Sequence, residues 1–360
     1  MKDISEMKEN SGLKKESEMK KTGKMKIVWK IILITTAAGL VLSILGLALG
    51  ASRVLYVDRS GLHVTGSGVS HITEWGLEAF KNIQIDAGLS DIEFISSDKY
   101  GIDLYGDNME WNWTLENGLL RITHDRGTRL QVMNLDFIST ERNHVKIFLP
   151  VDTNLETVDI KTSSGNIKLS YIQTERLEAT TSFGDINLSN ITSDNMKISV
   201  SSGKFTGKNL DAQSLTYTSS FGDGQFQSVK ATNFTADSSS GNLNLIGCDL
   251  GDMNIKTNFG DITAYGLIST GANIQARSGG INITGDISGE NIINTSFGDI
   301  KLTMGGRRED YSFDITVRFG DITIDGERLR DQGSFVSSPV QQNHFIISSS
   351  SGDIRMNFEG

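Results

Sequence analysis

The chain has 360 residues, with 34 Lys and Arg against 44 Asp and Glu, which gives a formal net charge of −10. This acidic balance argues against nucleic-acid binding, which needs a basic face. The single cysteine excludes an internal disulfide. The five histidines never stand at a ligand spacing such as i, i+4, so no zinc site built from Cys and His is expected.

The N-terminal part of the sequence predicts a membrane anchor. Residues 31–51, IILITTAAGLVLSILGLALGA, carry no charge and are long enough to span a bilayer. The preceding tail, residues 1–26, holds eight Lys against five acidic residues. The positive-inside bias therefore predicts a cytoplasmic basic tail over 1–26, a transmembrane helix over 27–51 and a C-terminal bulk outside. The alternative is a signal peptide cleaved after the small residues Ala48 and Gly50.

Within this apolar stretch, Gly46 and Gly50 stand in a G-x-x-x-G spacing. Such a spacing lets two membrane helices pack closely, so a weak homodimer through the helix is one hypothesis. The other is that glycine is simply common in membrane helices.

Residues 52–79 are predicted to be a membrane-proximal linker, and residues 80–150 an N-terminal β cap that closes the repeats that follow. Trp111 and Trp113, in EWNWT, lie on one face of an expected strand. They are interpreted either as core of this cap, which terminal repeat units need, or as rings that stack on a sugar.

Residues 151–360 contain an internal repeat. The hexapeptide TSFGDI stands at 181–186 and again at 295–300, and glycines recur at intervals of 19 between and beyond these copies. Two further copies of the motif, at Gly320 and Gly352, fall off this step. A period of this length indicates a stacked architecture. The regular glycines are Gly165, Gly184, Gly203, Gly222, Gly241, Gly260, Gly279 and Gly298.

The repeat alternates apolar and polar residues, which is typical of half-buried strands. In the unit of Gly184, for example, Ile186 and Leu188 flank Asn187 and are expected to point inward, as is Ile198 of a second strand. Each unit is therefore predicted to contain two short strands and two corners. The predicted fold is all-β: a β-solenoid of about ten coils, because one unit cannot bury its apolar side alone. A 38-residue coil with four strands stays open as an alternative to the 19-residue coil.

The residue before each repeat glycine alternates strictly between Ser and Phe. The members are Ser164, Phe183, Ser202, Phe221, Ser240, Phe259, Ser278 and Phe297. These side chains are expected to point inward, where a ring over a small Ser of the neighbouring coil would pack closely. In a 38-residue coil the rings would instead stack on one another.

The aspartate column and the single cysteine predict no catalytic or metal-binding chemistry. Asp185, Asp223, Asp261, Asp299 and Asp321 follow the Phe-Gly corners. A calcium site is one reading of this column, but the capping of turn N–H groups is preferred. Cys248 falls in an apolar column and is expected to be a buried hydrophobe. No catalytic, cofactor-binding or metal-binding residue is predicted, and no cofactor.

The stretches FKNIQIDAGLSDIEFISSD (80–98), VKIFLPVDTNLETVDIKTSSGNIKL (145–169), the SSGN and SFGD corners, and IISSSSGDIRMNF (346–358) resemble the bacterial putative-adhesin family, a β-strand-repeat domain of unknown function. The resemblance covers about residues 80–360 and implies an extracytoplasmic β-solenoid that is often tethered to the membrane. It carries over no catalytic residue. Inserts at 305–312 and 326–343 depart from the plainest pattern and could hold a binding loop.

These observations predict a single-pass cell-membrane protein with its N-terminus in the cytoplasm and its repeats outside. The expected function is a non-enzymatic, adhesin-like interaction module whose partner is a surface protein or a cell-wall glycan, and not a nucleic acid. Two alternatives remain: an accessory or sensor component of a cell-envelope stress response, and a polysaccharide-active solenoid enzyme.

Overall fold

The computed structural model divides into two compact units, residues 1–68 with 127–139 and residues 69–126 with 140–360. The residues that the structure describes are 29–30, 32–43, 45, 54–58, 61–65, 69–107, 110–125, 130–134, 142–330, 333–337 and 340–360.

The first unit contains helical residues and a small antiparallel sheet. Residues 29–30, 32–43 and 45 are helical. Among the described residues, no helix is both long and apolar enough to span a membrane. The transmembrane helix was predicted over 27–51, and the other residues of this range lie outside the described part of the chain. The sheet has the order β2–β1–β9, formed by β1 (Val54–Asp58), β2 (Gly61–Thr65) and β9 (Leu130–Asn134). Strands therefore occupy part of the range in which we expected a linker.

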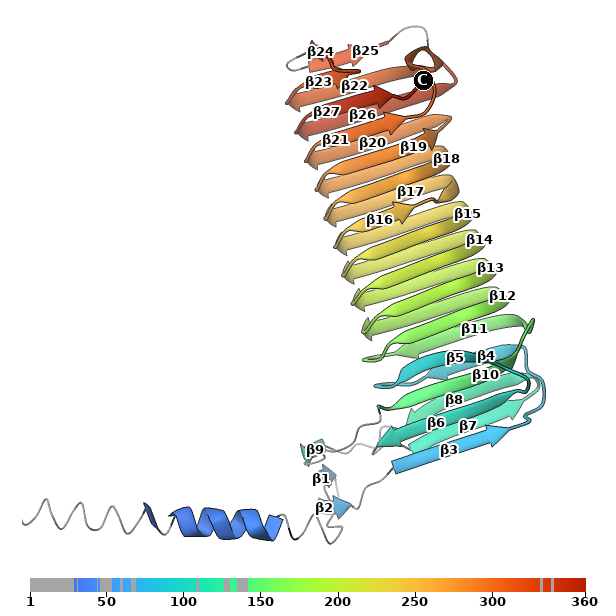
Figure 1. Cartoon of the computed structure of the whole chain (residues 1–360), viewed down its shortest axis with the longest axis vertical. Helices are drawn as coiled ribbons and strands as arrows, with labels where there is room; N and C mark the ends of the chain where they lie inside the picture. Colours follow the sequence, from blue (N-terminus) through green and yellow to red (C-terminus); the bar gives the residue numbers. More distant parts are fainter. Residues whose placement is uncertain are drawn as a thin grey trace, which may run out of the picture. The chain divides into compact units, whose positions relative to one another are not determined.

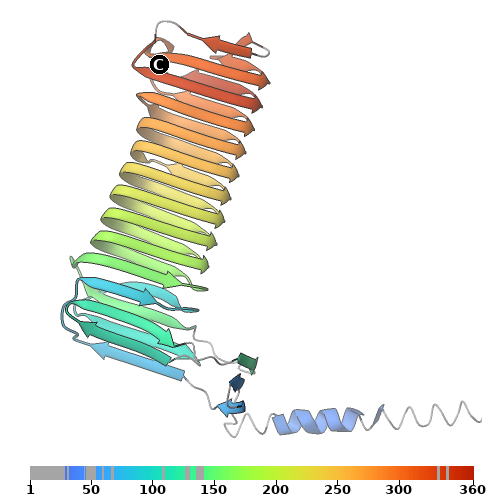
Figure 2. The ribbon, with the colours of Figure 1, turned by 180° about the vertical axis from the view of Figure 1, so that it is seen from behind.

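The second unit is a rod of stacked strands that starts with a cap (Figures 1 and 2). The cap consists of β3 (Val69–Trp75), β4 (Asn82–Asp86), β5 (Asp91–Ser97), β6 (Gly101–Asp107), β7 (Glu110–Glu116), β8 (Leu119–Asp125) and β10 (His144–Pro150). The pairs β3–β6, β6–β10 and β7–β8 are antiparallel, whereas β4–β8 and β5–β10 are parallel. Trp111 is buried and Trp113 packs against the core, so Trp111 belongs to the cap interior.

Parallel coils follow the cap, and their register fixes the repeat. Ile167 pairs with Ile186, and Ile186 pairs with Phe205, so each coil is 19 residues long. The 38-residue alternative is therefore wrong. The strands are β11 (Asn154–Thr162), β12 (Ile167–Phe183), β13 (Ile186–Ser202), β14 (Phe205–Phe221), β15 (Gly224–Ser240), β16 (Leu243–Ile246), β17 (Asp249–Phe259), β18 (Ile262–Ser278), β19 (Ile281–Ile287), β20 (Glu290–Phe297) and β21 (Ile300–Met304).

Each coil bends at three places, not at two as we expected. In β13 the strict inward–outward alternation breaks after Leu188 and again after Ser193, where two outward residues follow one another. The third bend is the glycine corner that closes the coil. At the first bend Asn190 has a φ of 54°, and Tyr171 has 57° in the coil before it. The buried side chains of β13 are Ile186, Leu188, Ile191, Ser193, Met196, Ile198 and Val200.

The far end of the rod does not follow chain order. β26 (Asn343–Ser351) lies between β20 and β22 (Tyr311–Phe319), and β27 (Ile354–Phe358) lies between β21 and β23 (Ile322–Ile324). The chain thus builds its outermost coil first and then inserts the last coil beneath it. β24 (Glu327–Arg330) and β25 (Gly333–Val336), in the expected insert at 326–343, pair antiparallel with β23 and β22. A short 3₁₀ turn, Arg308–Asp310, lies in the other insert.

Candidate functional site

The most distinctive surface of the rod is a column of exposed phenylalanines, here called the Phe ladder. It comprises Phe183, Phe221, Phe259, Phe297 and Phe319, whose side chains are 57–64% exposed. The first four close β12, β14, β17 and β20, and Phe319 closes β22. The arrowheads of the long strands β12 to β15, which end at the glycine corners, lie along one edge of the rod, on the left in Figure 1 and on the right in Figure 2. The prediction that these rings point inward is therefore wrong.

The local reason lies in the glycine corner. Val200 is buried, but Ser201 and the three residues after it, which include Gly203, all stay outside the core. The pairing between β13 and β14 is also interrupted at Ser201. Val200 and Ser202 both have partners on β14, whereas Ser201 has none there. The alternation with period two thus stops at the corner, and the side chain before the glycine turns to solvent.

Ser and Phe alternate along this edge in space as well as in sequence. Phe183 pairs with Ser202, and Ser202 pairs with Phe221. At the far end, Phe297 pairs with Ser351, which also pairs with Phe319. The sequence order there is Phe, Phe, Ser, but the exchanged coils restore the spatial order Phe, Ser, Phe.

Leu89 continues the ladder at the cap end. The N–H group of Ser164 donates a hydrogen bond of 3.0 Å to the carbonyl of Gly88, and the carbonyl of Ser90 lies beneath Gly165. Leu89 therefore stands below Ser164, where an alternating column would place a large residue, and its side chain is 56% exposed. We did not foresee this residue, although it stands before SDI as the phenylalanines stand before GDI.

The aspartates two residues after each Phe form a second column beside the rings. Oδ1 of Asp185 accepts a hydrogen bond of 2.8 Å from the N–H of Lys204 in the next coil, and Oδ1 of Asp223 does the same with Asn242. Asp261 repeats the contact with Gly280. These bonds support the capping interpretation, with the partner one coil away. The term ladder edge is used for the Phe ladder together with the serines between its rings and the five aspartates. The serines are Ser202, Ser240, Ser278 and Ser351, and the aspartates are Asp185, Asp223, Asp261, Asp299 and Asp321.

The other carboxylate oxygen of Asp185, Asp223 and Asp261 faces solvent. All three residues are exposed, and no described residue donates a hydrogen bond or forms an ion pair with that oxygen. Within the described part of the chain, no group of three His, Cys, Asp or Glu residues is arranged to hold a metal ion. The ladder edge therefore offers acceptor oxygens beside apolar rings.

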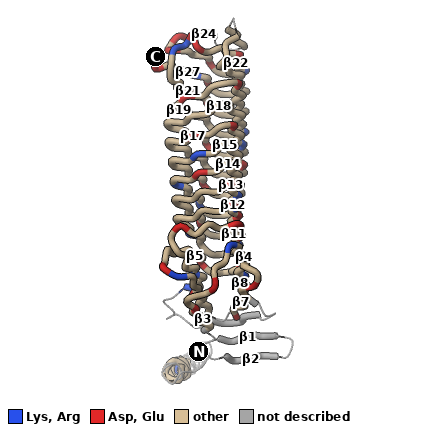
Figure 3. Tube along the Cα trace, turned by 90° about the vertical axis from the view of Figure 1, so that its right-hand side faces the viewer, with Lys and Arg blue, Asp and Glu red and all other residues tan. Residues whose placement is uncertain are grey.

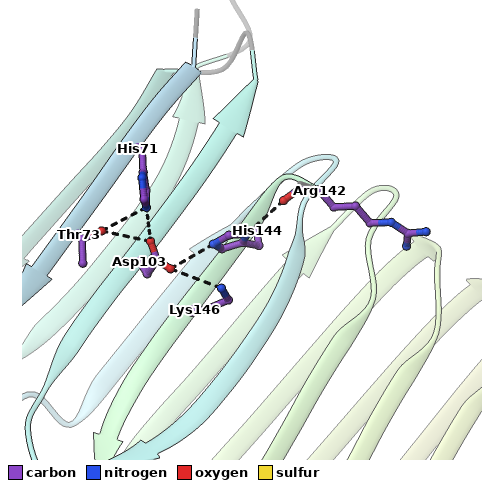
Figure 4. Close-up of polar contacts among 6 residues, drawn as sticks. All are labelled: His71, Thr73, Asp103, Arg142, His144 and Lys146. Atoms are coloured by element: carbon purple, nitrogen blue, oxygen red, sulfur yellow. Dashed lines mark hydrogen bonds and ion pairs between the residues drawn. The ribbon is translucent and has the colours of Figure 1, made fainter. Parts of the chain in front are cut away.

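A second polar cluster lies on the cap, where Asp103 on β6 stands between β3 and β10 (Figure 4). Its Oδ1 is 2.7 Å from Nε2 of His71, and its Oδ2 is 3.2 Å from Nε2 of His144 and 3.5 Å from Nζ of Lys146. Burial acts to raise the pKa of Asp103. The hydrogen bonds from His71 and His144 and the charges of His144 and Lys146 outweigh it, and the pKa falls below 3.8.

The geometry of this cluster fits a structural role, in which hydrogen bonds and ion pairs join three neighbouring strands. Oγ1 of Thr73 lies 3.3 Å from Nε2 of His71, the same nitrogen that faces Asp103. A hydrolytic triad needs the carboxylate and the nucleophile on different imidazole nitrogens. The ring of Tyr105 stacks on that of His144, with 5.5 Å between the ring centroids. Sequence reasoning missed it because its members come from three separate strands.

Cys248 is buried in the coil interior, as the apolar column predicted. Burial raises the pKa of its thiol, so the thiolate is disfavoured and the residue is a poor nucleophile.

The rod, its in-register glycine corners and its cap define a β-repeat protein of the solenoid class. The family model Toastrack DUF4097 matches residues 80–215 and 194–357, and the chain belongs to this family. The resemblance to a family of adhesin-like β-repeat domains is thereby confirmed.

Solved structures that the chain resembles include a putative adhesin from Bacteroides fragilis, with 16% identity over 80% of this chain and 97% of that one, at a TM-score of 0.37. A putative adhesin from Parabacteroides distasonis shows 12% identity over 81% and 97%, at a TM-score of 0.36. A putative cell adhesion protein from Clostridium sporogenes shows 10% identity over 81% and 100%, at a TM-score of 0.18. No curated protein matches the chain significantly.

Proposed function

We propose that the protein is a non-enzymatic surface-interaction module in which the ladder edge is the contact surface. The observation that carries this proposal is the Phe ladder: five large aromatic side chains, each more than half exposed, lie in one column. Leaving such rings in water forgoes the stabilisation that their burial would provide. Large exposed apolar side chains are ordinarily scattered singly over a surface, and their gathering in one column typically marks an interaction site.

The sequence supports a cellular setting for this module. An uncharged stretch over 31–51 follows a basic tail, which favours an anchor in the cell membrane with the rod outside the cytoplasm. Figure 3 views the rod from the edge opposite the ladder and shows basic and acidic residues interspersed along it.

The proposal is tested by site-specific photocrosslinking with the full-length chain in living source cells. A photoreactive phenylalanine analogue at Phe221 is expected to form a covalent adduct with the partner. The matched control places the same analogue at Tyr265, which is 50% exposed and lies outside the ladder edge. Adducts from Tyr265 as abundant as those from Phe221, or none from Phe221, would show that the ladder is not the contact surface.

A further inference from the structure

The large side chains of the ladder edge recur along the rod at a fixed spacing. One large residue recurs every second coil, and coils of paired strands are about 4.8 Å apart, so the rings recur about every 9.6 Å. The exchange of β22 and β26 preserves this period at the end of the rod, where chain order alone would have broken it. A compact globular partner would not need such a period. A linear polymer with a matching repeat would use every ring.

The chemistry along the edge narrows the polymer. Each ring offers a flat π face with a partial negative charge, on which the C–H groups of a sugar ring can stack. Beside the rings of Phe183, Phe221 and Phe259, an aspartate keeps one carboxylate oxygen unpartnered within the described structure. Such an oxygen accepts hydrogen bonds from hydroxyl groups. Between the rings stand the hydroxyl groups of Ser202 and Ser240, which can donate as well as accept.

The charge of the ladder edge narrows the class of polymer further. The chain carries a net charge of −10, and Asp185, Asp223 and Asp261 stand beside the rings over most of the ladder. At the far end Arg355 lies 3.9 Å from Asp299 and Arg328 lies 2.6 Å from Asp321. The part of the edge that holds the three unpaired aspartates therefore disfavours nucleic acids and other polyanions. A second copy of the rod is also disfavoured. If two copies met antiparallel, with rings seated over serines, the two aspartate columns would face each other. A neutral, hydroxyl-rich polymer meets neither obstacle.

We propose that the ladder edge binds an extended β-1,4-linked polysaccharide, one disaccharide to each Phe. In such a chain each sugar is flipped relative to the last, so the same face recurs once per disaccharide. That repeat is close in length to the two-coil step of the ladder. An α-1,4-linked chain curls and could not follow a straight edge. This inference rests on the proposed function and names the partner class for the same surface.

The geometry predicts affinity that depends on length. One ring on one sugar binds weakly, but linked contacts add as the chain covers successive rings. Each added disaccharide should therefore raise affinity about 2–10-fold, the range expected for one stacking contact. The gain should continue until the oligosaccharide spans the whole ladder.

The test uses the full-length protein in a detergent without a sugar headgroup. Titration calorimetry compares di-, tetra-, hexa- and octasaccharides of β-1,4-linked N-acetylglucosamine with β-1,4-linked glucose oligomers and with α-1,4-linked glucose oligomers as the geometric control. We expect stepwise gains for the β-linked series and none for the α-linked series. A flat length dependence, or equal binding of both linkages, would overturn the inference.

The variants locate the binding. The double variant Phe221→Ser, Phe259→Ser interrupts the ladder in its middle and should lower octasaccharide affinity about 10-fold or more, with an unchanged thermal midpoint. The matched variant Tyr265→Ser, Ile268→Ser removes two exposed apolar side chains outside the ladder edge and should bind like the parent. Equal affinity of both variants would refute the assignment. So would self-association that depends on the ladder, measured by sedimentation velocity, without any oligosaccharide binding.

The two experiments together distinguish a failure of the polysaccharide proposal from a failure of the proposed contact surface. Adducts from the photoreactive residue at Phe221, combined with no oligosaccharide binding, would refute the polysaccharide and leave the interaction surface standing. If Phe221 formed no adduct and no oligosaccharide bound, both proposals would fail.

Discussion

Phe297 at the end of β20 lies beside Ser351 at the end of β26, although β21 and the whole outermost coil come between them in the chain. This pairing keeps large and small residues alternating on the ladder edge. In sequence order the large residues Phe297 and Phe319 would be neighbours. The alternation is therefore a property of the surface, which supports a role for the surface itself.

Two phenylalanines of neighbouring coils should respond very differently to truncation. Phe226 is fully buried, whereas Phe221 is 64% exposed. Phe226→Ala should cost about 3–5 kcal/mol, because it removes buried apolar surface and leaves a cavity. Phe221→Ala should change the free energy of unfolding by less than about 0.5 kcal/mol. Urea denaturation followed by circular dichroism measures both, and an equally large loss at Phe221 would mean that its ring is packed.

The same contrast applies to adding bulk. Ser238 is fully buried and Ser240 lies on the ladder edge. Ser238→Phe should overpack the core and cost about 1–3 kcal/mol. Ser240→Phe should leave the denaturation midpoint unchanged, because the new ring would extend into solvent between Phe221 and Phe259. A lowered midpoint for Ser240→Phe would contradict the outward orientation of this column.

The topology proposed from the sequence has a direct test. Protease added to intact cells should digest the rod and spare the tail, residues 1–26, because the charge step around 31–51 favours a cytoplasmic N-terminus. Antibodies against each part would follow the fragments. A mature protein that begins at Ala51 and is shed from the cell would disprove the anchor.

Much of the coil could be predicted because its signal is periodic. Ile186, Leu188 and Ile198 are buried as the alternation indicated, and the glycine spacing equals the coil length. The first bend of each coil was missed, because the period-two alternation was read straight through Tyr171 and Asn190, where the backbone takes a positive φ. The sequence does carry a signal for this bend, because the equivalent residues of the later coils, Asn209, Ser228, Gly247 and Gly266, are of types that favour turns and also have a positive φ.

The ladder edge escaped prediction for a related reason. Alternation with period two was extended through the glycine corner, where the chain turns and the pleat no longer applies. The exchange of β22 and β26 could not be predicted, because it is a choice between two nearly equivalent pairing partners. Likewise, the cluster around Asp103 joins strands distant in sequence, so no spacing of residues reveals it.

The corner glycines should be irreplaceable where coils stack. Gly222 has a φ of 147°, and a Cβ atom there would overlap the carbonyl oxygen of Gly203 in the adjacent coil. Gly222→Ala should therefore cost more than about 3 kcal/mol, from backbone strain combined with overpacking. Gly247 has a φ of 59°, and a Cβ atom there would meet no other atom within 4 Å. Gly247→Ala should cost only about 1–2 kcal/mol, the strain of the left-handed backbone. Similar losses at the two sites would show that coil contact at the corner is unimportant.

The cap should weaken in acid because of Asp103. A carboxyl group whose pKa is lower in the folded state contributes stability above its unfolded pKa, and this contribution is lost as pH falls through the folded pKa. The pKa of Asp103 is lowered from 3.8, so its contribution should be complete above that pH and disappear below it. The Asp103→Asn variant should be less stable than the parent at neutral pH, and the difference should shrink as the pH falls below 3.8. Thermal midpoints of both proteins across this range measure the difference. A constant difference at every pH would mean that Asp103 acts through its shape or hydrogen bonds, and that its charge does not hold β3, β6 and β10 together.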